Sequence, residues 1–303
     1  MNINKAFKDP RLMAALTGST LEEFNELLPE FEEEWINKKK EEHEKKCKIR
    51  KWGGGSKGFV PTIKEKLFFI FFYYKCYPTY DLAAIIFDCD RSQACRRQFD
   101  LSEVLEKVLG MKLVLPERQM RSTEEFFKAF PEAKEIINDC TERPIQRPKN
   151  KQKQKDNYSG KKKRHTRKNL LITDKDKYVG FLSETVNGKD HDFSILKKHA
   201  PPDNMPKDIK KHFDLAFEGF EKQFPGHIVS IPEKKPRAKE MDPATKEQNK
   251  QKSSVRVRVE HAIGGVKRLR IVSDVFRGKK KGFDDIVILI SCGLWNYHLK
   301  ARR

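Results

Sequence analysis

The chain has 303 residues, a length that corresponds to two or three ordinary domains. Its 64 Lys and Arg residues against 44 Asp and Glu give a formal net charge of +20. A surplus of this size favours a polyanionic partner such as nucleic acid, which releases counterions when cations bind, over a merely soluble basic protein.

The sequence argues against membrane insertion and against a disulfide-rich fold. The strongest apolar run, Leu67–Tyr74, is shorter than the ~20 residues that span a bilayer, so we expect no membrane contact. The segment MNINKAFKDPRL lacks the apolar stretch of a signal peptide, which predicts a cytoplasmic protein. Six cysteines without a CxxC pair are typical of reduced thiols.

Residues 1–58 predict a charged helical segment that ends in a linker. Ser19 or Thr20 is a candidate N-cap for the helix that follows. Apolar residues then repeat at helical spacing, at Leu21, Phe24, Leu27 and Leu28. The glycine-rich stretch 52–58 is predicted to be a flexible joint.

Residues 59–112 predict an all-α helix-turn-helix domain. A first helix is expected from Pro61 or Thr62 to about Tyr77, and Thr79 can cap a short second helix. A tight turn and an arginine-bearing third helix follow, which is the layout of a DNA reader, although a purely structural three-helix unit has the same pattern. The groove-facing candidates are Arg91, Gln93, Arg96 and Arg97.

Residues 113–303 mix strand and helix patterns, which predicts an α/β layer fold. Helices are expected at 122–130, 191–199, 253–271 and 282–303. Strands are expected at 134–146, 165–175, 177–188, 210–220 and 227–232. The polar, proline-containing stretch at about 232–252 predicts an exposed loop.

Three acids in this region stand out by their local setting. Asp139 lies near the end of an apolar strand, Asp214 lies at a predicted strand edge, and Glu260 shares a helix face with Arg256 and Gly264. Three carboxylates can hold two Mg²⁺ ions, which activate a nucleophile and stabilise the leaving oxygen in phosphoryl transfer. The alternative is that all three are ordinary surface acids.

At these same residues the sequence resembles bacterial insertion-sequence DDE transposases of the insertion-sequence-five type. NDCTERPI resembles the first-aspartate motif of that family, and FDLAFEGF resembles the second. YSGKKKRHTRKNLLITD resembles its basic strand pair, and GKDHDF its short His-Asp element. The most specific likeness is the segment around VEHAIGGVKRLRI, which resembles the segment that carries the family's glutamate.

The resemblance implies an RNase H-like mixed sheet with flanking helices, preceded by the helix-turn-helix domain. It implies that Asp139, Asp214 and Glu260 are the catalytic and metal-binding triad, with two Mg²⁺ ions for which Mn²⁺ can substitute. It further implies a bacterial, nucleoid-associated transposase that binds terminal inverted repeats, cuts them and joins them to target DNA as a dimer or larger assembly. No organic cofactor is expected. Cys140, Ala216 and Phe217 depart from the family's motifs.

Several other residues are interpreted beside the triad. Basic side chains expected to contact double-stranded DNA, rather than to be merely solvated, are Lys161, Lys162, Lys163, Arg164, Arg167, Lys267, Arg268 and Arg270. Asp192 is expected to cap the helix that follows it, with metal contact as the alternative.

The alternative functions are a catalytically decayed or repurposed DNA-binding protein, favoured by Cys140, a nuclease that cuts without joining, and an RNA-binding protein.

Overall fold

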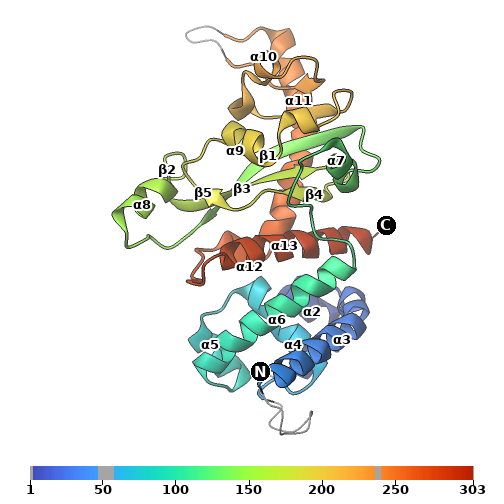
Figure 1. Ribbon diagram of the computed structural model, residues 1–303, viewed down its shortest axis with the longest axis vertical. Helices are drawn as coiled ribbons and strands as arrows, with labels where there is room; N and C mark the ends of the chain where they lie inside the picture. The colour runs from blue at the N-terminus through green and yellow to red at the C-terminus, as the bar shows by residue number, and fades with distance from the viewer. Residues whose placement is uncertain (1–2, 47–57, 236–239, 303) are drawn as a thin grey trace. The chain divides into compact units, whose positions relative to one another are not determined.

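The computed structural model describes residues 3–46, 58–235 and 240–302 (Figure 1). The predicted joint at 52–58 lies outside these residues apart from Gly58. The chain forms two units. A helical unit comprises Met1–Val114, Lys267–Asp274 and Ile286–Arg303, and an α/β unit comprises Leu115–Val266 and Val275–Asp285.

This division differs from the expected boundaries at 58 and 112. Residues 3–46 do not stand apart from the helix-turn-helix, because the helix Leu21–Lys46 packs on the helices Ile63–Cys76 and Arg91–Met111. The chain also returns to the helical unit after Val266, so the C-terminal region is not one continuous domain. The helices of this unit are α1 (Ile3–Ala6), α2 (Pro10–Thr17), α3 (Leu21–Lys46), α4 (Ile63–Cys76), α5 (Tyr80–Phe87), α6 (Arg91–Met111), α12 (Arg270–Ser273) and most of α13 (Phe283–Lys300).

Helix α4 is the centre of the helical unit. Every residue from Lys66 to Tyr74 is buried, and a helix that is apolar all round needs cover on every side. Helices α2, α3, α6 and α12 supply this cover. Thr62 caps the helix in a reciprocal capping box with Glu65, so the helix begins after Thr62 and Pro61 lies outside it.

Helices α5 and α6 form the predicted helix-turn-helix pair. Thr79 caps α5 by accepting a hydrogen bond from the Leu82 N–H at 3.1 Å. Asp90 and Gln93 form a capping box at the start of α6. Helix α6 continues to Met111, further than the arginine-bearing segment alone indicates, because Leu101, Val104, Leu105, Val108 and Leu109 extend its buried stripe.

The first and last long helices of the helical unit meet at a buried carboxylate. Glu23, at the start of α3, accepts hydrogen bonds from the Ser19 hydroxyl at 2.8 Å and the Thr20 N–H at 3.0 Å. Its other oxygen lies 2.6 Å from Nδ1 of His298 on α13. Burial raises the pKa of Glu23, but the hydrogen bonds from His298, Thr20 and Ser19 outweigh burial, so the net pKa lies below the usual value.

The α/β unit is built on a seven-stranded mixed sheet. Its strands are β1 (Glu135–Pro144), β2 (Tyr158–Ser159), β3 (Arg164–Thr173), β4 (Val179–Leu182), β5 (Val186–Asn187), β6 (Lys210–His212) and β7 (Val229–Ser230). The order along the main path is β2-β3-β1-β6-β7, with β4 and β5 also paired to β3. Strand β3 is antiparallel to β1, whereas β6 and β7 run parallel to it.

Helices cover the sheet. They are α7 (Thr123–Ala129), α8 (Lys151–Asn157), α9 (Asp192–His199), α10 (Phe220–Gln223) and α11 (Pro243–Lys267), with short 3-10 turns at Pro202–Asn204 and Leu215–Phe217. Figure 1 shows α11 crossing behind the strands while α7 and α9 lie in front of them. Ile136, Leu170, Ile172 and Phe181 from the strands form one core with α7, α9 and α10. The fold class predicted from the sequence is therefore confirmed.

Two expected elements were wrong. The segment 210–220 is not one strand, because β6 ends at His212 and Asp214 caps a 3-10 turn by accepting the Ala216 N–H at 2.9 Å. The expected loop at about 232–252 is helical in its second half. Helix α11 begins at Pro243 because Asp242 accepts the N–H groups of Ala244 and Thr245.

Within the described parts of the chain, no helix is both long and apolar enough to cross a membrane. The five described cysteines are free thiols, as the sequence predicts.

We predict that Glu23→Gln destabilises the protein by about 1.5–3 kcal/mol at pH 7, because it weakens charge-assisted hydrogen bonds in a buried place. A carboxylate with a depressed pKa contributes stability above its unfolded pKa of ~4.3 and loses it as the pH falls through its folded pKa. The difference between variant and wild type in urea unfolding should therefore shrink toward pH 4. The exposed neighbour Glu22→Gln is the control, and an equal loss in both variants would contradict the assignment.

Candidate active site and DNA-contacting residues

The pairing of β1 with β6 sets the two candidate aspartates side by side. The strands are parallel, and Ile137 lies opposite His212. Asp139 lies two residues after Ile137, and Asp214 lies two residues after His212. The two aspartates are therefore at matching positions on neighbouring segments. The Asp139 carboxylate accepts the Cys140 N–H at 2.8 Å, and that of Asp214 accepts the Ala216 N–H.

The electrostatics of this pair are unfavourable for two bare carboxylates. Burial, and then the negative charge of Asp214, raise the pKa of Asp139 to about 6. Arg256 on α11 and the Cys140 N–H act in the opposite direction without cancelling the rise. Two close carboxylates that disfavour each other's charge form a donor set suited to a hard divalent cation.

Glu260 forms no hydrogen bond or ion pair with either aspartate within the described part of the chain. It is exposed on α11, four residues after Arg256 and therefore on the same helix face. The charge of Arg256 acts on Asp139, so this face of α11 is directed toward the aspartate pair. Among the described residues, no three His, Cys, Asp or Glu side chains are already grouped to hold a metal ion.

A buried lysine that binds Asp192 was not predicted from the sequence. Lys168 on β3 donates to the Asp192 carboxylate at 2.9 Å and to the Asp190 carbonyl at 2.8 Å, and Glu142 lies 3.8 Å away. Lys168 is only 8 % exposed. The available signal was a lysine inside the strand run KNLLIT, since a fully buried lysine normally requires a partner.

Asp192 has a different role from the expected helix cap. Helix α9 is capped from His191, whose side chain makes no capping hydrogen bond, and Asp192 is already the first helical residue. The Asp192 carboxylate pairs with Lys168, and its charge acts on both Asp139 and Cys140. It is therefore a third acid in the surroundings of the aspartate pair.

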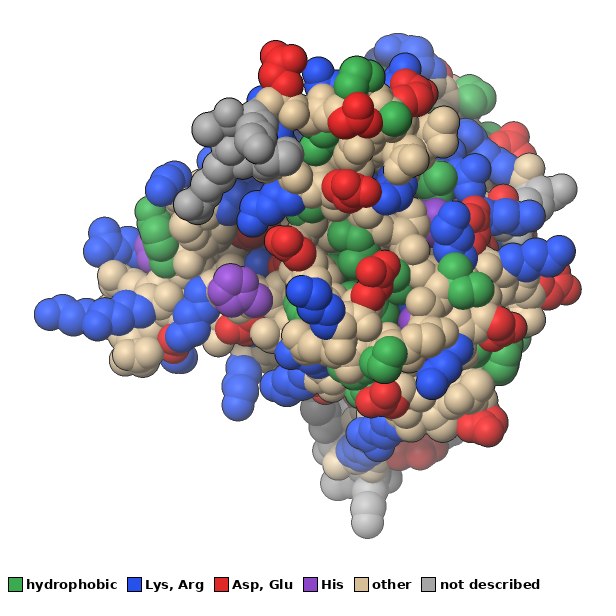
Figure 2. All heavy atoms as spheres, turned by 90° about the horizontal axis from the view of Figure 1, so that it is seen from above, with side chains coloured by type: hydrophobic (Ala, Val, Ile, Leu, Met, Phe, Trp, Pro, Cys, Tyr) green, Lys and Arg blue, Asp and Glu red, His purple; other side chains and the backbone are tan. Residues whose placement is uncertain are grey.

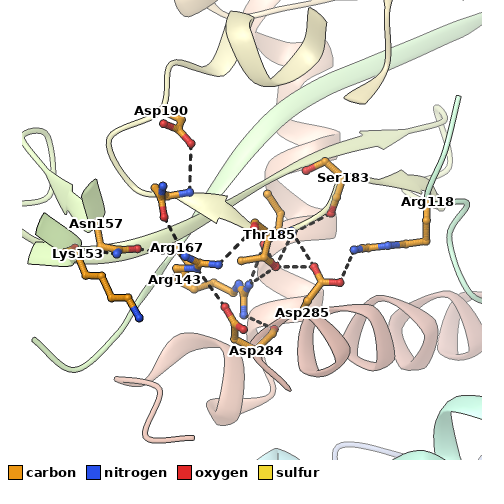
Figure 3. A network of polar contacts seen from close by, with 12 residues as sticks. Arg118, Arg143, Lys153, Asn157, Arg167, Ser183, Thr185, Asp190, Asp284 and Asp285 are labelled. Atoms are coloured by element: carbon orange, nitrogen blue, oxygen red, sulfur yellow. Dashed lines mark hydrogen bonds and ion pairs between the residues drawn. The ribbon is translucent and has the colours of Figure 1, made fainter. Parts of the chain in front are cut away.

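Arg167 belongs to a second polar network, shown in Figure 3. Its guanidinium donates to Asp284 at 3.2 Å and to Asn187 at 2.9 Å. The neighbouring Arg143, 2 % exposed, donates to the Asp284 carbonyl, to Asn169 and to Thr185. Arg167 is thus bound within the α/β unit rather than extended for a DNA phosphate, and the network joins β1 and β3 to the start of α13.

The other basic candidates of the α/β unit form no such side-chain contacts with the residues that the structure describes. Lys161, Lys162 and Lys163 are exposed between β2 and β3, and Arg164, the first residue of β3, is also exposed. Helix α8, which precedes β2 in the same connection between β1 and β3, adds the exposed residues Lys151, Lys153 and Lys155. Figure 2 shows Lys and Arg side chains projecting at the side that carries α8 and β2 (left in both views).

The candidates on α6 divide into exposed and inward-facing residues. Arg91, Gln93 and Arg96 are exposed near the start of the helix. Arg97 instead lies over the ring of Trp35, 5.1 Å from its centroid, and burial lowers the pKa of its guanidinium. Arg97 therefore packs α6 on α3, and Arg91 and Arg96 are the arginines of this helix available to DNA.

The candidates after α11 lie in the helical unit. Arg268 lies 5.8 Å over the Trp295 ring, and burial lowers its pKa. Arg270 is exposed and pairs with Asp274 at 3.0 Å, while Lys267 is partly exposed. Arg270 and Lys267 are the more accessible of the three.

Comparison with known proteins identifies the class. Residues 138–296, more than half of the chain, match the family described as DDE superfamily endonuclease. Residues 60–110 match the family described as the helix-turn-helix of DDE superfamily endonuclease. The chain therefore belongs to the DDE superfamily endonucleases, which generally use divalent metal ions.

A curated relative supports the same conclusion. The chain is 27% identical over 241 residues to a probable transposase for insertion sequence element IS702 from Microchaete diplosiphon, covering 79% of this chain and 82% of that protein. No solved structure matched the chain. The resemblance to insertion-sequence DDE transposases found in the sequence motifs is confirmed.

We predict that Lys168→Met destabilises the protein by about 3 kcal/mol, because it leaves buried carboxylates without their cation. Adding Asp192→Asn should recover part of this loss, since the second change removes the stranded charge. Chemical unfolding of the two single variants and the double variant measures the coupling. Lys175→Met is the control, because Lys175 is exposed and forms no ion pair with another described residue. Strictly additive losses would show that the pair is not coupled.

Proposed function

We propose that this chain is the transposase of a DNA insertion sequence, which binds terminal inverted repeats and catalyses Mg²⁺-dependent strand cleavage and strand transfer. The observation that carries the proposal is the register of β1 and β6, which sets Asp139 beside Asp214 in a DDE endonuclease fold. The helix-turn-helix match in the same chain supports DNA recognition, and the curated relative is itself named a probable transposase.

Asp139 and Asp214 would hold the metal, and Glu260 would complete the set. The two aspartates fit a divalent cation because their mutual repulsion is relieved by positive charge. Glu260 lies one helical turn from Arg256 on the face of α11 directed toward them. When bound, two Mg²⁺ ions activate the attacking oxygen and stabilise the leaving oxygen of an in-line phosphoryl transfer.

The exposed basic side chains of the chain would position the DNA. Arg91 and Arg96 at the start of α6 would read the element ends, with Gln93 beside them. Lys161, Lys162, Lys163 and Arg164 would follow a phosphate strand, because phosphate contacts fix the register of a duplex. Lys267 and Arg270 would add contacts from the helical unit.

The remaining assignments follow from this role. Residues 59–112 would act as the DNA-binding domain, and the α/β unit as the catalytic domain. Two element ends must be joined in one reaction, so we propose that the protein acts as a dimer or larger assembly on double-stranded DNA. Phosphoryl transfer depends mainly on positioning and charge neutralisation, which suits a site built from carboxylates and surrounding cations.

A DNA-binding protein without catalysis is the second candidate. Glu260 is exposed and not grouped with the aspartates, which favours this reading. Cys140, which departs from the family's motif, is the partly buried neighbour of Asp139. Burial, and then the charge of Asp192, raise the pKa of its thiol. Mg²⁺-dependent nicking by the purified protein separates the two functions, and a pre-cut end separates a joining enzyme from a nuclease that only cuts.

We expect Glu260→Gln to reduce Mg²⁺-dependent nicking of element-end DNA by at least about a hundredfold, because a carboxylate that would help to hold the charge-neutralising cations is lost. End binding should be largely retained. The matched control is Glu247→Gln, an exposed glutamate on the same helix. Nicking by Glu260→Gln at the wild-type rate would remove this residue from the site.

We expect Arg91→Ala combined with Arg96→Ala to weaken binding to element ends at least about tenfold in gel-shift titrations, since each arginine contact to a base edge is worth ~1–3 kcal/mol. Lys107→Ala is the control on the same helix, because Lys107 pairs with Glu34 of α3. If the double variant and the control bind equally, α6 is not the reading helix.

A further inference from the structure

A cavity of about 510 Å³ lies along α9 in the α/β unit. Neither Asp139 nor Asp214 lines it. Its lining consists of Val186, Lys189, Asp190, His191, Ser194, Ile195, Lys198 and His199. Its volume is within the ~300–1,000 Å³ that small-ligand sites occupy. Neither the motifs nor the proposed triad assign it a ligand.

The lining combines an apolar floor with imidazole rings and cations. Val186 and Ile195 supply apolar surface, and His191 and His199 supply flat rings. The lysine Lys189 is already paired with Asp156. Lys198 is exposed and forms no ion pair or hydrogen bond within the described part of the chain. An apolar floor, stacking rings and one available cation are complementary to a base joined to a phosphate.

His199 carries an unmet hydrogen-bonding requirement. Its Nε2 is buried and has no partner among the described residues. Burial, and then the charge of Lys198, lower the pKa of His199 and so favour the neutral form of its ring. A neutral imidazole can stack on a base or exchange a hydrogen bond with a base edge, and a ligand group reaching Nε2 would satisfy this atom.

The backbone connects this cavity to the aspartate pair. Asp190 and His191 line the cavity, and the next residue, Asp192, is the acid whose charge acts on Asp139. Lys168 donates hydrogen bonds to both ends of this short segment, to the Asp190 carbonyl and to the Asp192 carboxylate. The cavity lining is thus continuous in the chain with an acid that influences Asp139.

We propose that this cavity holds one unstacked nucleotide of the DNA strand that passes the aspartate pair, with its phosphate on Lys198 and its base beside Val186 and the two histidines. This inference rests on the proposed function for its biological ligand. Holding one nucleotide out of the stack would fix the strand next to the scissile phosphate. The site takes a deoxynucleoside phosphate rather than a free anion, because half of its contacts are apolar or aromatic.

Histidine ring signals of the full-length protein, labelled at carbon-13, report on this site directly. The chain has eight histidines, and loss of one signal in His199→Asn assigns His199. Titration with thymidine 5′-monophosphate should shift the His199 signal and saturate in the millimolar range. Inorganic phosphate at equal concentration should leave it nearly unmoved. An equal shift with phosphate, or no shift with the nucleotide, overturns the proposal.

Variants on α9 test the lining. Lys198→Ala should weaken nucleotide binding about fivefold, as expected for an exposed ion pair, while the adjacent Lys197→Ala should not. Lys197 is the matched control because it lies on Phe193 and reaches Gln223 instead of lining the cavity. Ser194→Trp, at an exposed lining position, should abolish the shift without lowering the melting temperature. Equal effects of Lys197→Ala and Lys198→Ala would contradict the proposed contact.

These titrations require no cleavage, so they separate this inference from the proposed function. If the nucleotide shifts the His199 signal but the protein never nicks DNA, the nucleotide site is supported and the proposed transposase activity is refuted. Normal nicking in the Ser194→Trp variant, together with no His199 response in wild type, refutes only the nucleotide site.

Discussion

The parallel pairing of β1 with β6 is the constraint on which the candidate site depends. The hydrogen-bond register that sets Ile137 opposite His212 also fixes Asp139 beside Asp214. A shift of one residue would turn one carboxylate to the other face of the sheet. Burial, and then the negative charge of Asp214, raise the pKa of Asp139 to about 6, so the pairing of the strands imposes an electrostatic cost that a cation would relieve. Strand pairing thus maintains an arrangement that the two carboxylates alone would avoid.

Buried cations maintain the sheet around that arrangement. Lys168 binds Asp192 and the Asp190 carbonyl close behind Asp139, and Arg143 binds Asp284, Asn169 and Thr185 further along β1. Each cation is costly to bury and is held by several oxygen partners, so removing one partner leaves the buried charge less well compensated. The same geometry explains why Arg167 and Arg97 are not free for DNA. Their guanidiniums are committed to Asp284 and Asn187, and to Trp35.

The basic surplus of the chain is therefore divided between two tasks. Part of it stabilises the fold through internal pairs, and part remains exposed on the connection between β1 and β3 and at the start of α6. Only the exposed part can supply salt-dependent affinity for a phosphate backbone. The cavity beside α9 adds a more selective contact, because it combines one available lysine with apolar and aromatic surface. Affinity and local strand placement would then come from different residues.

Local patterns in the sequence predicted many of the helices and strands, and its motifs predicted the family that the chain resembles. Apolar periodicity and capping residues such as Thr62 and Thr79 are local, so α4, α5 and α13 could be predicted. The motifs around Asp139 and Asp214 also identified these two residues as candidate metal ligands. Only the tertiary structure decided that Lys168 and Asp192 meet, that Arg97 turns inward, and that residues after Val266 return to the helical unit. These outcomes depend on contacts between residues far apart in the chain, and side-chain spacing along a single element carries no information about such partners.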